Sequence, residues 1–163
     1  MNKHIEQLYK IAQKEERLII GLMSGTSLDG LDIALCSFKG FGKNTNCNVL
    51  AFETIPYQSF FRTEIQSVFS KQNVNLEKLC LLNAHIAKVH ASMINHFLDK
   101  HQYPKEQIDL IASHGQTIYH APKHLHQQEQ YDNATLQIGD GDHLAVNTGI
   151  TTISDFRQKH VAA

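Results

Sequence analysis

Two apolar runs joined by a short polar turn constrain the N-terminal part of this chain. Residues 17–23 and 31–38 are almost entirely apolar, and the turn between them is rich in Gly, Ser, Thr and Asp. Asp29-Gly30 between apolar runs is a strong β-hairpin signal. Strands without polar alternation are typical of a sheet that is covered on both faces. The sequence therefore predicts an antiparallel strand pair within an α/β domain.

The turn itself has the composition of an anion-binding loop. Three glycines within residues 21–30 leave the backbone free to adopt a positive φ and to approach a ligand closely. Ser24, Thr26 and Ser27 add hydroxyl groups, and successive N–H groups in a tight turn form a concavity that suits phosphate. No Lys follows the glycines and a strand comes next, so the turn is not a Walker loop. An ordinary hairpin turn is the alternative.

Composition limits the other possibilities. With 163 residues and 42% hydrophobic content, the chain can form one globular domain. A formal charge of -1 argues against a nucleic-acid or anionic membrane partner. No apolar stretch approaches the ~20 residues that cross a bilayer, and residues 1–17 lack the apolar core of a secretory signal. Three cysteines without ligand spacing indicate a reducing cytosol, so we expect a cytoplasmic protein.

Apolar spacing predicts the order of the remaining elements. They are a helix at 2–16, a strand at 47–56, helices at 58–70 and 75–101, strands at 109–113 and 135–138, a helix at 142–147 and a strand at 150–154. The histidines of the long helix, His85, His90 and His96, are predicted to be exposed or half-buried. The polar segment 114–117 follows strand 109–113, at the carboxyl end where open α/β sheets bind ligands.

Eleven histidines raise the possibility of a metal site, above all His114, His120, His124 and His126. A structural zinc site needs close pairs completed by further ligands, and no cysteine lies near these residues. The polar run 123–132 is typical of a solvated loop. We therefore expect no transition metal here.

Four motifs in a fixed order carry a family resemblance. They are Met-Ser-Gly-Thr-Ser-Leu-Asp-Gly-Leu-Asp (23–32), Ser-His-Gly-Gln-Thr (113–117) with His120 and Pro122 after it, Thr-Leu-Gln-Ile-Gly-Asp (135–140) and Asp-Phe-Arg (155–157). Together they resemble the N-terminal part of anhydro-N-acetylmuramic acid kinases, sugar kinases of the actin/hexokinase-like superfamily. The resemblance implies an RNase H-like α/β lobe with a mixed central sheet flanked by helices. That lobe would span 17–163, after an N-terminal helical extension at 1–16.

The resemblance also implies an activity. Members of the family use ATP and Mg²⁺ to phosphorylate the 6-position of 1,6-anhydro-N-acetylmuramic acid, with hydrolytic opening of the anhydro ring, in peptidoglycan recycling. By resemblance, the turn holds the ATP phosphates through Gly25, Thr26, Ser27, Leu28, Asp29, Gly30, Leu31 and Asp32. The residues implied for the amino-sugar site are His114, Gln116, Thr117, His120, Asp155 and Arg157.

Several assignments stay open at the level of sequence. Related kinases carry an Asp two residues before the turn glycine, where this chain has Met23, so Asp29 and Asp140 are the candidate Mg²⁺ contacts. Asp29 would otherwise make a turn hydrogen bond, and Asp140 would cap a helix. Arg157 offers a donor fork for a carboxylate or phosphate, or forms a structural pair with Asp155.

Two departures from the family pattern bear on activity. His160 stands where many members have an Asp. The chain ends at Ala163, whereas members continue with a glycine-rich segment and a second lobe that holds the adenosine site and the water-activating Asp. We therefore expect no catalytic base in this chain, no activity from it alone, and self-association through the exposed inter-lobe surface. The alternatives are another actin-like phosphotransferase and a non-catalytic nucleotide- or sugar-binding module.

Overall fold

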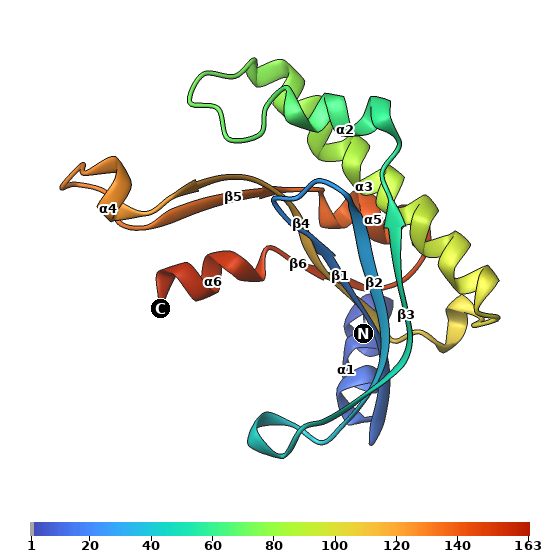
Figure 1. Cartoon of the computed structure of the whole chain (residues 1–163). Helices are drawn as coiled ribbons and strands as arrows, with labels where there is room; N and C mark the ends of the chain where they lie inside the picture. The colour runs from blue at the N-terminus through green and yellow to red at the C-terminus, as the bar shows by residue number, and fades with distance from the viewer. Residues whose placement is uncertain (1) are drawn as a thin grey trace.

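A computed structural model describes residues 2–163, and its strands form one mixed sheet flanked by helices (Figure 1). The strands are β1 (Glu16–Ser24), β2 (Gly30–Lys39), β3 (Asn46–Pro56), β4 (Leu110–Ala121), β5 (Ala134–Ile138) and β6 (Thr152–Ser154). The α-helices are α1 (Lys3–Gln13), α2 (Ser59–Gln66), α3 (Leu76–Lys100), α4 (Lys123–His126), α5 (Gly141–Thr148) and α6 (Phe156–Ala162). Two 3₁₀ turns, at Gly42–Asn44 and Lys105–Gln107, complete the elements.

The strand order in the sheet is β3-β2-β1-β4-β5, and β6 also pairs with β4. The first three strands are antiparallel neighbours, whereas β4 runs parallel to β1, and β6 runs parallel to β4. This arrangement confirms the predicted α/β class and the mixed sheet with flanking helices. The predicted hairpin is the β1–β2 pair.

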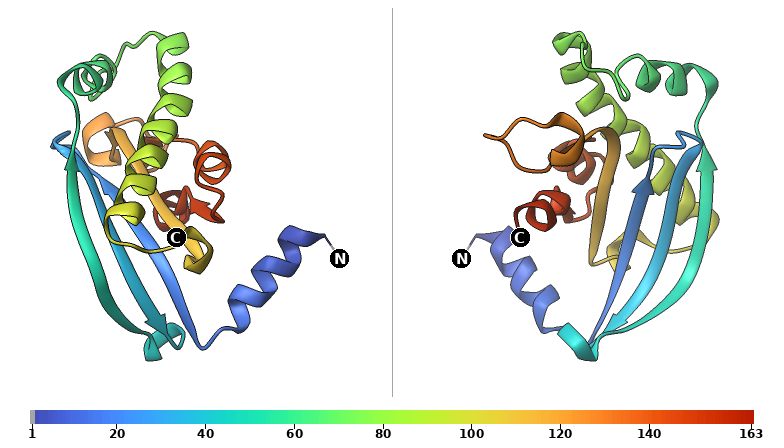
Figure 2. Two further views of the ribbon diagram at one scale, coloured as in Figure 1. Left: turned by 90° about the vertical axis from the view of Figure 1, so that its right-hand side faces the viewer. Right: turned by 60° about the vertical axis from the view of Figure 1, so that its left-hand side comes forward.

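The core lies between α3 and one face of the sheet (Figure 2). Leu82, Ile86 and Phe97 follow one another along α3 at steps of four and eleven residues and are almost completely buried, as helical periodicity predicts. On the edge strand β3, Val49 and Phe52 are 57% and 59% exposed. The sheet therefore carries exposed apolar side chains on the face away from α3.

Helix α1 confirms the predicted N-terminal helix and projects from the base of β1 (Figure 2). Arg17 ties its C-terminal end to the strand, because its guanidinium donates to the carbonyl groups of Ile11 and Ala12. Ile11 is buried, but Ile5, Leu8 and Tyr9 are exposed. None of the helices within residues 2–163 meets the length and hydropathy that a bilayer-spanning segment requires.

The largest error of the sequence prediction concerns the segment 109–121. The predicted strand ends at Ser113, but β4 continues to Ala121 because residues 116–121 pair with β5. The motif 114–117 thus lies within β4 and not at its end. The strands that end beside it are β1, whose Ser24 pairs with Gln116, and β6, whose Ser154 pairs with Ser113.

Two smaller corrections concern the helices. The predicted helix at 58–70 ends at Gln66, since Ser70 adopts a positive φ of 56° and donates its N–H to the Ile118 carbonyl. His90 of α3 is 1% exposed, not surface or half-buried, because it has a buried partner in the Tyr57 hydroxyl at 2.7 Å.

Candidate functional site

The turn between β1 and β2 presents free amide groups to solvent. Within residues 2–163, the N–H groups of Gly25, Thr26 and Ser27 have no protein acceptor, and the side chains of Thr26 and Ser27 are exposed. Its two end carbonyls are held from inside: Gly25 accepts from Gln116 at 2.9 Å and Asp29 accepts from the Tyr57 N–H at 3.0 Å. This pattern, with carbonyls held inward and amides free, suits an anion such as phosphate.

The glycines of the turn do not act as expected. None of Gly21, Gly25 and Gly30 has a positive φ; that conformation falls on Leu28, at 55°. Gly30 is needed for close packing, because a Cβ there would lie 2.4 Å from the Ile55 carbonyl oxygen. The prediction that the glycines supply left-handed backbone in this turn is wrong.

The eight residues assigned to phosphate binding separate into three groups. Leu28, Gly30 and Leu31 are buried and contribute to packing. The Asp32 carboxylate accepts from the Thr54 hydroxyl at 2.5 Å. The remaining four residues, Gly25, Thr26, Ser27 and Asp29, form the accessible rim of the turn.

Asp29 is the acidic side chain on that rim. Hydrogen bonds from the Ser27 hydroxyl, at 2.6 Å, and from nearby backbone amides hold the pKa of Asp29 below its usual range. No group of three or more potential metal ligands exists within residues 2–163. Because Mg²⁺ is often held by one or two carboxylates together with substrate phosphates, a lone Asp29 fits a cation that arrives with a nucleotide.

Asp140 is a helix cap, which is the alternative to a Mg²⁺ contact that the sequence left open. Its carboxylate accepts from the His143 N–H at 2.9 Å and caps the N-terminus of α5. The helix cap accounts for this residue without a metal.

His114 and Arg157 meet beside the turn. The Arg157 guanidinium donates to His114 Nε2 at 2.8 Å, and His114 Nδ1 lies 3.1 Å from the Gly115 carbonyl oxygen. Burial and the nearby guanidinium charge lower the pKa of His114. The imidazole is therefore neutral, with its proton on Nδ1. Arg157 makes no ion pair with Asp155 anywhere in the described residues, so the predicted structural pair between them is absent.

A polar cavity of about 400 Å³ adjoins His114. Strand β4, the ends of β5 and β6 with the residues that follow them, and the start of α5 line it, including Ser113, Gly139, Ser154 and Asp155. Its convergent polar groups suit a small polar ligand.

Gln137 is the functional candidate that the sequence analysis missed in this cavity. Its Nε2 donates to the Thr135 hydroxyl at 2.7 Å, whereas its buried Oε1 has no partner within residues 2–163. A buried acceptor without a partner is costly, which marks it as available to a ligand. The residue lies inside a quoted motif, but no local pattern singled it out. Asn83 on α3 was also missed. Its Oδ1 accepts from the Gly139 N–H at 2.8 Å and so holds Gly139 in the wall of the cavity.

The structure thus brings together only some of the predicted sugar-site residues. His114 and Asp155 line the polar cavity, and Arg157 contacts His114. Gln116 and Thr117 are 0% and 3% exposed and cannot touch a ligand in this structure. His120 lies apart, bonded to Thr135 at 2.8 Å, beside a separate cavity of about 270 Å³ that Arg157 also lines.

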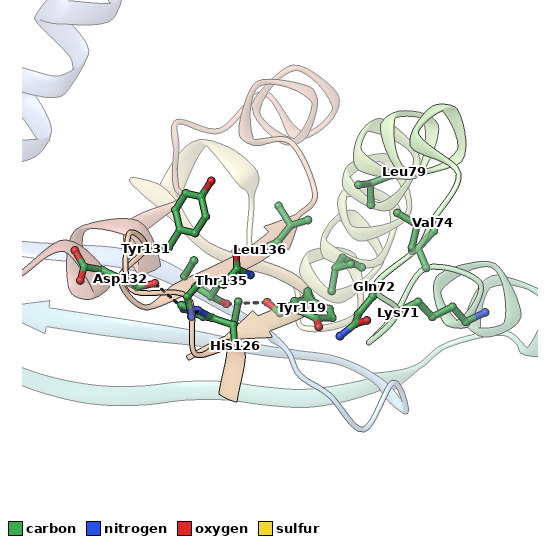
Figure 3. A pocket seen from close by; sticks show the side chains of 15 residues that line it. Lys71, Gln72, Val74, Leu79, Tyr119, His126, Tyr131, Asp132, Thr135 and Leu136 are labelled. Carbon is green, nitrogen blue, oxygen red and sulfur yellow. Dashed lines mark hydrogen bonds between the residues drawn. The ribbon is translucent and has the colours of Figure 1, made fainter. Parts of the chain in front are cut away.

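A larger cavity of about 660 Å³ lies between the α2–α3 connection and the β4–β5 hairpin (Figure 3). Val74, Leu79, Tyr119 and Leu136 make its lining mainly apolar. None of the predicted site residues lines it.

Comparison with known proteins decides the family. Residues 17–163 match the family described as anhydro-N-acetylmuramic acid kinase. The chain belongs to this family. It is consequently a member of the actin/hexokinase-like ATPases, and its mixed sheet is the sheet of such a lobe.

Individual members of the kinase family confirm the match. The anhydro-N-acetylmuramic acid kinase of Pseudoalteromonas atlantica is 57% identical over all 163 residues, which cover 41% of that relative. The Caldanaerobacter subterraneus kinase is 41% identical over 98% of the chain, and the Bacillus thuringiensis kinase is 40% identical over 89%. The chain spans about two fifths of the length of these relatives.

Proposed function

We propose that this chain forms one wall of the active site of an ATP-dependent kinase acting on 1,6-anhydro-N-acetylmuramic acid in cell-wall recycling. In the overall reaction, water adds to C1 and the bond from C1 to the bridging oxygen breaks. That oxygen is O6, and it takes the γ-phosphoryl group of ATP, which leaves ADP and a released proton. The observation that carries the proposal is the proximity of two features: free amides in the β1–β2 turn, and a polar cavity beside His114 on the adjoining strand.

The turn is the proposed phosphate site. Its amides at Gly25, Thr26 and Ser27 would donate to the terminal phosphates, and Asp29 would face the Mg²⁺ that accompanies them. Bound Mg²⁺ neutralises charge on the transferred group, and positioning accounts for most of the remaining catalysis in phosphoryl transfer.

The polar cavity is the proposed sugar site. Arg157 keeps guanidinium N–H groups beyond the one bonded to His114, and these suit the lactyl carboxylate of the sugar. The free Oε1 of Gln137 would accept from a sugar hydroxyl or from the acetamide N–H. His114 is a poor general base here, because its Nε2 already accepts from Arg157.

We further propose that the chain alone does not turn over, because it covers 41% of the length of the Pseudoalteromonas atlantica relative and supplies one wall of the proposed site. A missing base commonly costs ~10²–10⁴-fold, before the loss of positioning by the opposite wall. We also propose self-association, since Val49, Phe52 and Ile153 leave apolar side chains about half exposed. A monomeric sedimentation profile at high concentration would argue against that association.

A chimeric enzyme tests the function. This chain is joined to the remaining three fifths of the Pseudoalteromonas atlantica relative, and consumption of ATP is measured with the anhydro sugar and Mg²⁺. We expect sugar-dependent turnover by the chimera and none by the chain alone. A folded chimera that phosphorylates glycerol or acetate but not the anhydro sugar would contradict the proposal.

A further inference from the structure

Gln116 is a buried side chain beside the turn, and its amide nitrogen and oxygen are both hydrogen-bonded within the protein. It is 0% exposed, and its Nε2 group donates to the Gly25 carbonyl at 2.9 Å and to the Thr117 carbonyl at 3.1 Å. Its Oε1 accepts from the Ser24 hydroxyl. Both protons of the amide and its oxygen are therefore occupied, and none is left for a ligand.

The bond to Gly25 sets the direction of the next amide. In a trans peptide, the C=O and the following N–H point in opposite directions. Because Gln116 draws the Gly25 carbonyl inward, the Thr26 N–H of the same peptide group points outward, to the exposed side of the turn. We infer that Gln116 is a positioning residue that aims the Thr26 N–H at the bound phosphate. This inference rests on the proposed function of the turn.

Two carbonyl groups fix which way the Gln116 amide faces, and a buried hydrogen-bond chain continues from its Oε1. The Tyr57 hydroxyl lies 2.6 Å from Ser24 Oγ and 2.7 Å from His90 Nε2. The single Ser24 hydroxyl proton goes to Gln116, so Tyr57 donates to Ser24, and His90 donates to Tyr57. A flipped Gln116 amide would set its Oε1 against the Gly25 and Thr117 carbonyl oxygens, which can only accept, so these two carbonyl groups hold the NH₂ group toward Gly25.

The same chain holds the other end of the turn. The backbone N–H of Tyr57 donates to the Asp29 carbonyl, while its hydroxyl belongs to the chain that begins at His90 on α3. Helix α3 thus supports both ends of the turn through Tyr57 and Gln116. Directional hydrogen bonds, and not packing alone, therefore hold Gln116 and Tyr57 at the two ends of the turn.

The test compares the ¹³C,¹⁵N-labelled chain with Gln116→Met, which keeps the size of the side chain and removes its donors. Inorganic triphosphate with Mg²⁺ is titrated, and amide shifts of Gly25, Thr26 and Ser27 are followed well below the melting temperature. We expect the variant to bind triphosphate about tenfold more weakly and to lose the Thr26 shift. The carbonyl ¹³C resonance of Gly25 reports its hydrogen bond without any ligand and is expected to move. Ile111→Val, a buried apolar change in the same strand, is the control that should keep both signals.

The outcomes separate the two proposals. If the unmodified chain shows no triphosphate shift at the turn, the proposed function fails, whereas the Gly25 carbonyl signal still decides whether Gln116 holds that peptide. If the unmodified chain binds and Gln116→Met binds equally well with the same Thr26 shift, the positioning role is wrong. Gln116→Leu repeats the test should the Met variant fail to fold, because it also removes the donors and adds no charge at this buried position.

Discussion

The guanidinium of Arg157 donates to Nε2 of a neutral His114 across 2.8 Å. The Gly115 carbonyl orients the imidazole in turn. Arg157, the second residue of α6, is therefore fixed against the middle of β4. A strand and a helix 43 residues apart in sequence thus define one end of the candidate sugar cavity.

Arg157→Lys is expected to weaken binding of the anhydro sugar by about tenfold. Lysine keeps the charge but loses the planar fork that can contact His114 and a carboxylate together. Isothermal titration of the chain with the sugar measures the change, and Lys159→Gln, on the exposed part of α6, is the control. Equal affinity for the Arg157→Lys variant would exclude a direct role in holding the carboxylate.

The stability of the fold is expected to fall with acid below pH 6.5. Complete burial lowers the pKa of His90 from 6.5 to about 4, so the unfolded chain binds a proton between these values while the folded chain does not. This contribution is present above pH 6.5 and is lost as the pH falls toward 4, by roughly 3 kcal/mol. Urea unfolding across this range checks it. His90→Gln should flatten the slope; an unchanged slope would show that His90 is not the group responsible.

Gly115→Ala is expected to destabilise the chain by more than about 2 kcal/mol. Its φ is +74°, and a Cβ would lie 2.7 Å from the Ile138 carbonyl oxygen, so both strain and a backbone clash arise. Gly42→Ala is the matched control, since its φ is +58° with no atom within 4 Å of the added Cβ. That variant should lose only about 1 kcal/mol by urea unfolding. Similar losses in the two variants would contradict the close approach at Gly115.

Asp140→Ala is expected to cost about 1 kcal/mol in the free energy of unfolding, through loss of the α5 cap. Asp142→Ala, in the first turn of the same helix, is the control and should cost less. The loss should be the same with and without Mg²⁺. A loss that appears only when Mg²⁺ is present would instead make Asp140 a metal contact.

Local patterns were sufficient to predict most of the framework. The hairpin of β1 and β2 follows from its apolar runs, and α3 follows from a helical repeat that one face of the sheet buries. The continuation of β4 could not be predicted, because the polar side chains of residues 114–117 resemble a loop. Their partners are Ser24, Gly25 and β5, which the chain brings together only by folding.

Contacts between segments distant in sequence also explain why only some of the predicted site residues lie at the candidate site. His114, Asp155 and Arg157 were proposed through their motifs; the first two line one cavity, and Arg157 contacts His114. Gln116 belongs to the same motif, yet its depth of burial depends on β1 and Tyr57, which no local pattern specifies. Gln137 escaped notice because a free buried acceptor is visible only once its surroundings are packed.

A crystal structure of the chain soaked with inorganic triphosphate, Mg²⁺ and 1,6-anhydro-N-acetylmuramic acid tests the account most directly. We expect phosphate oxygens within hydrogen-bond distance of the Gly25–Ser27 amides, and the sugar in the cavity beside His114 and Gln137. Sugar bound instead between Leu79 and Tyr119, or triphosphate bound away from the turn, would contradict it.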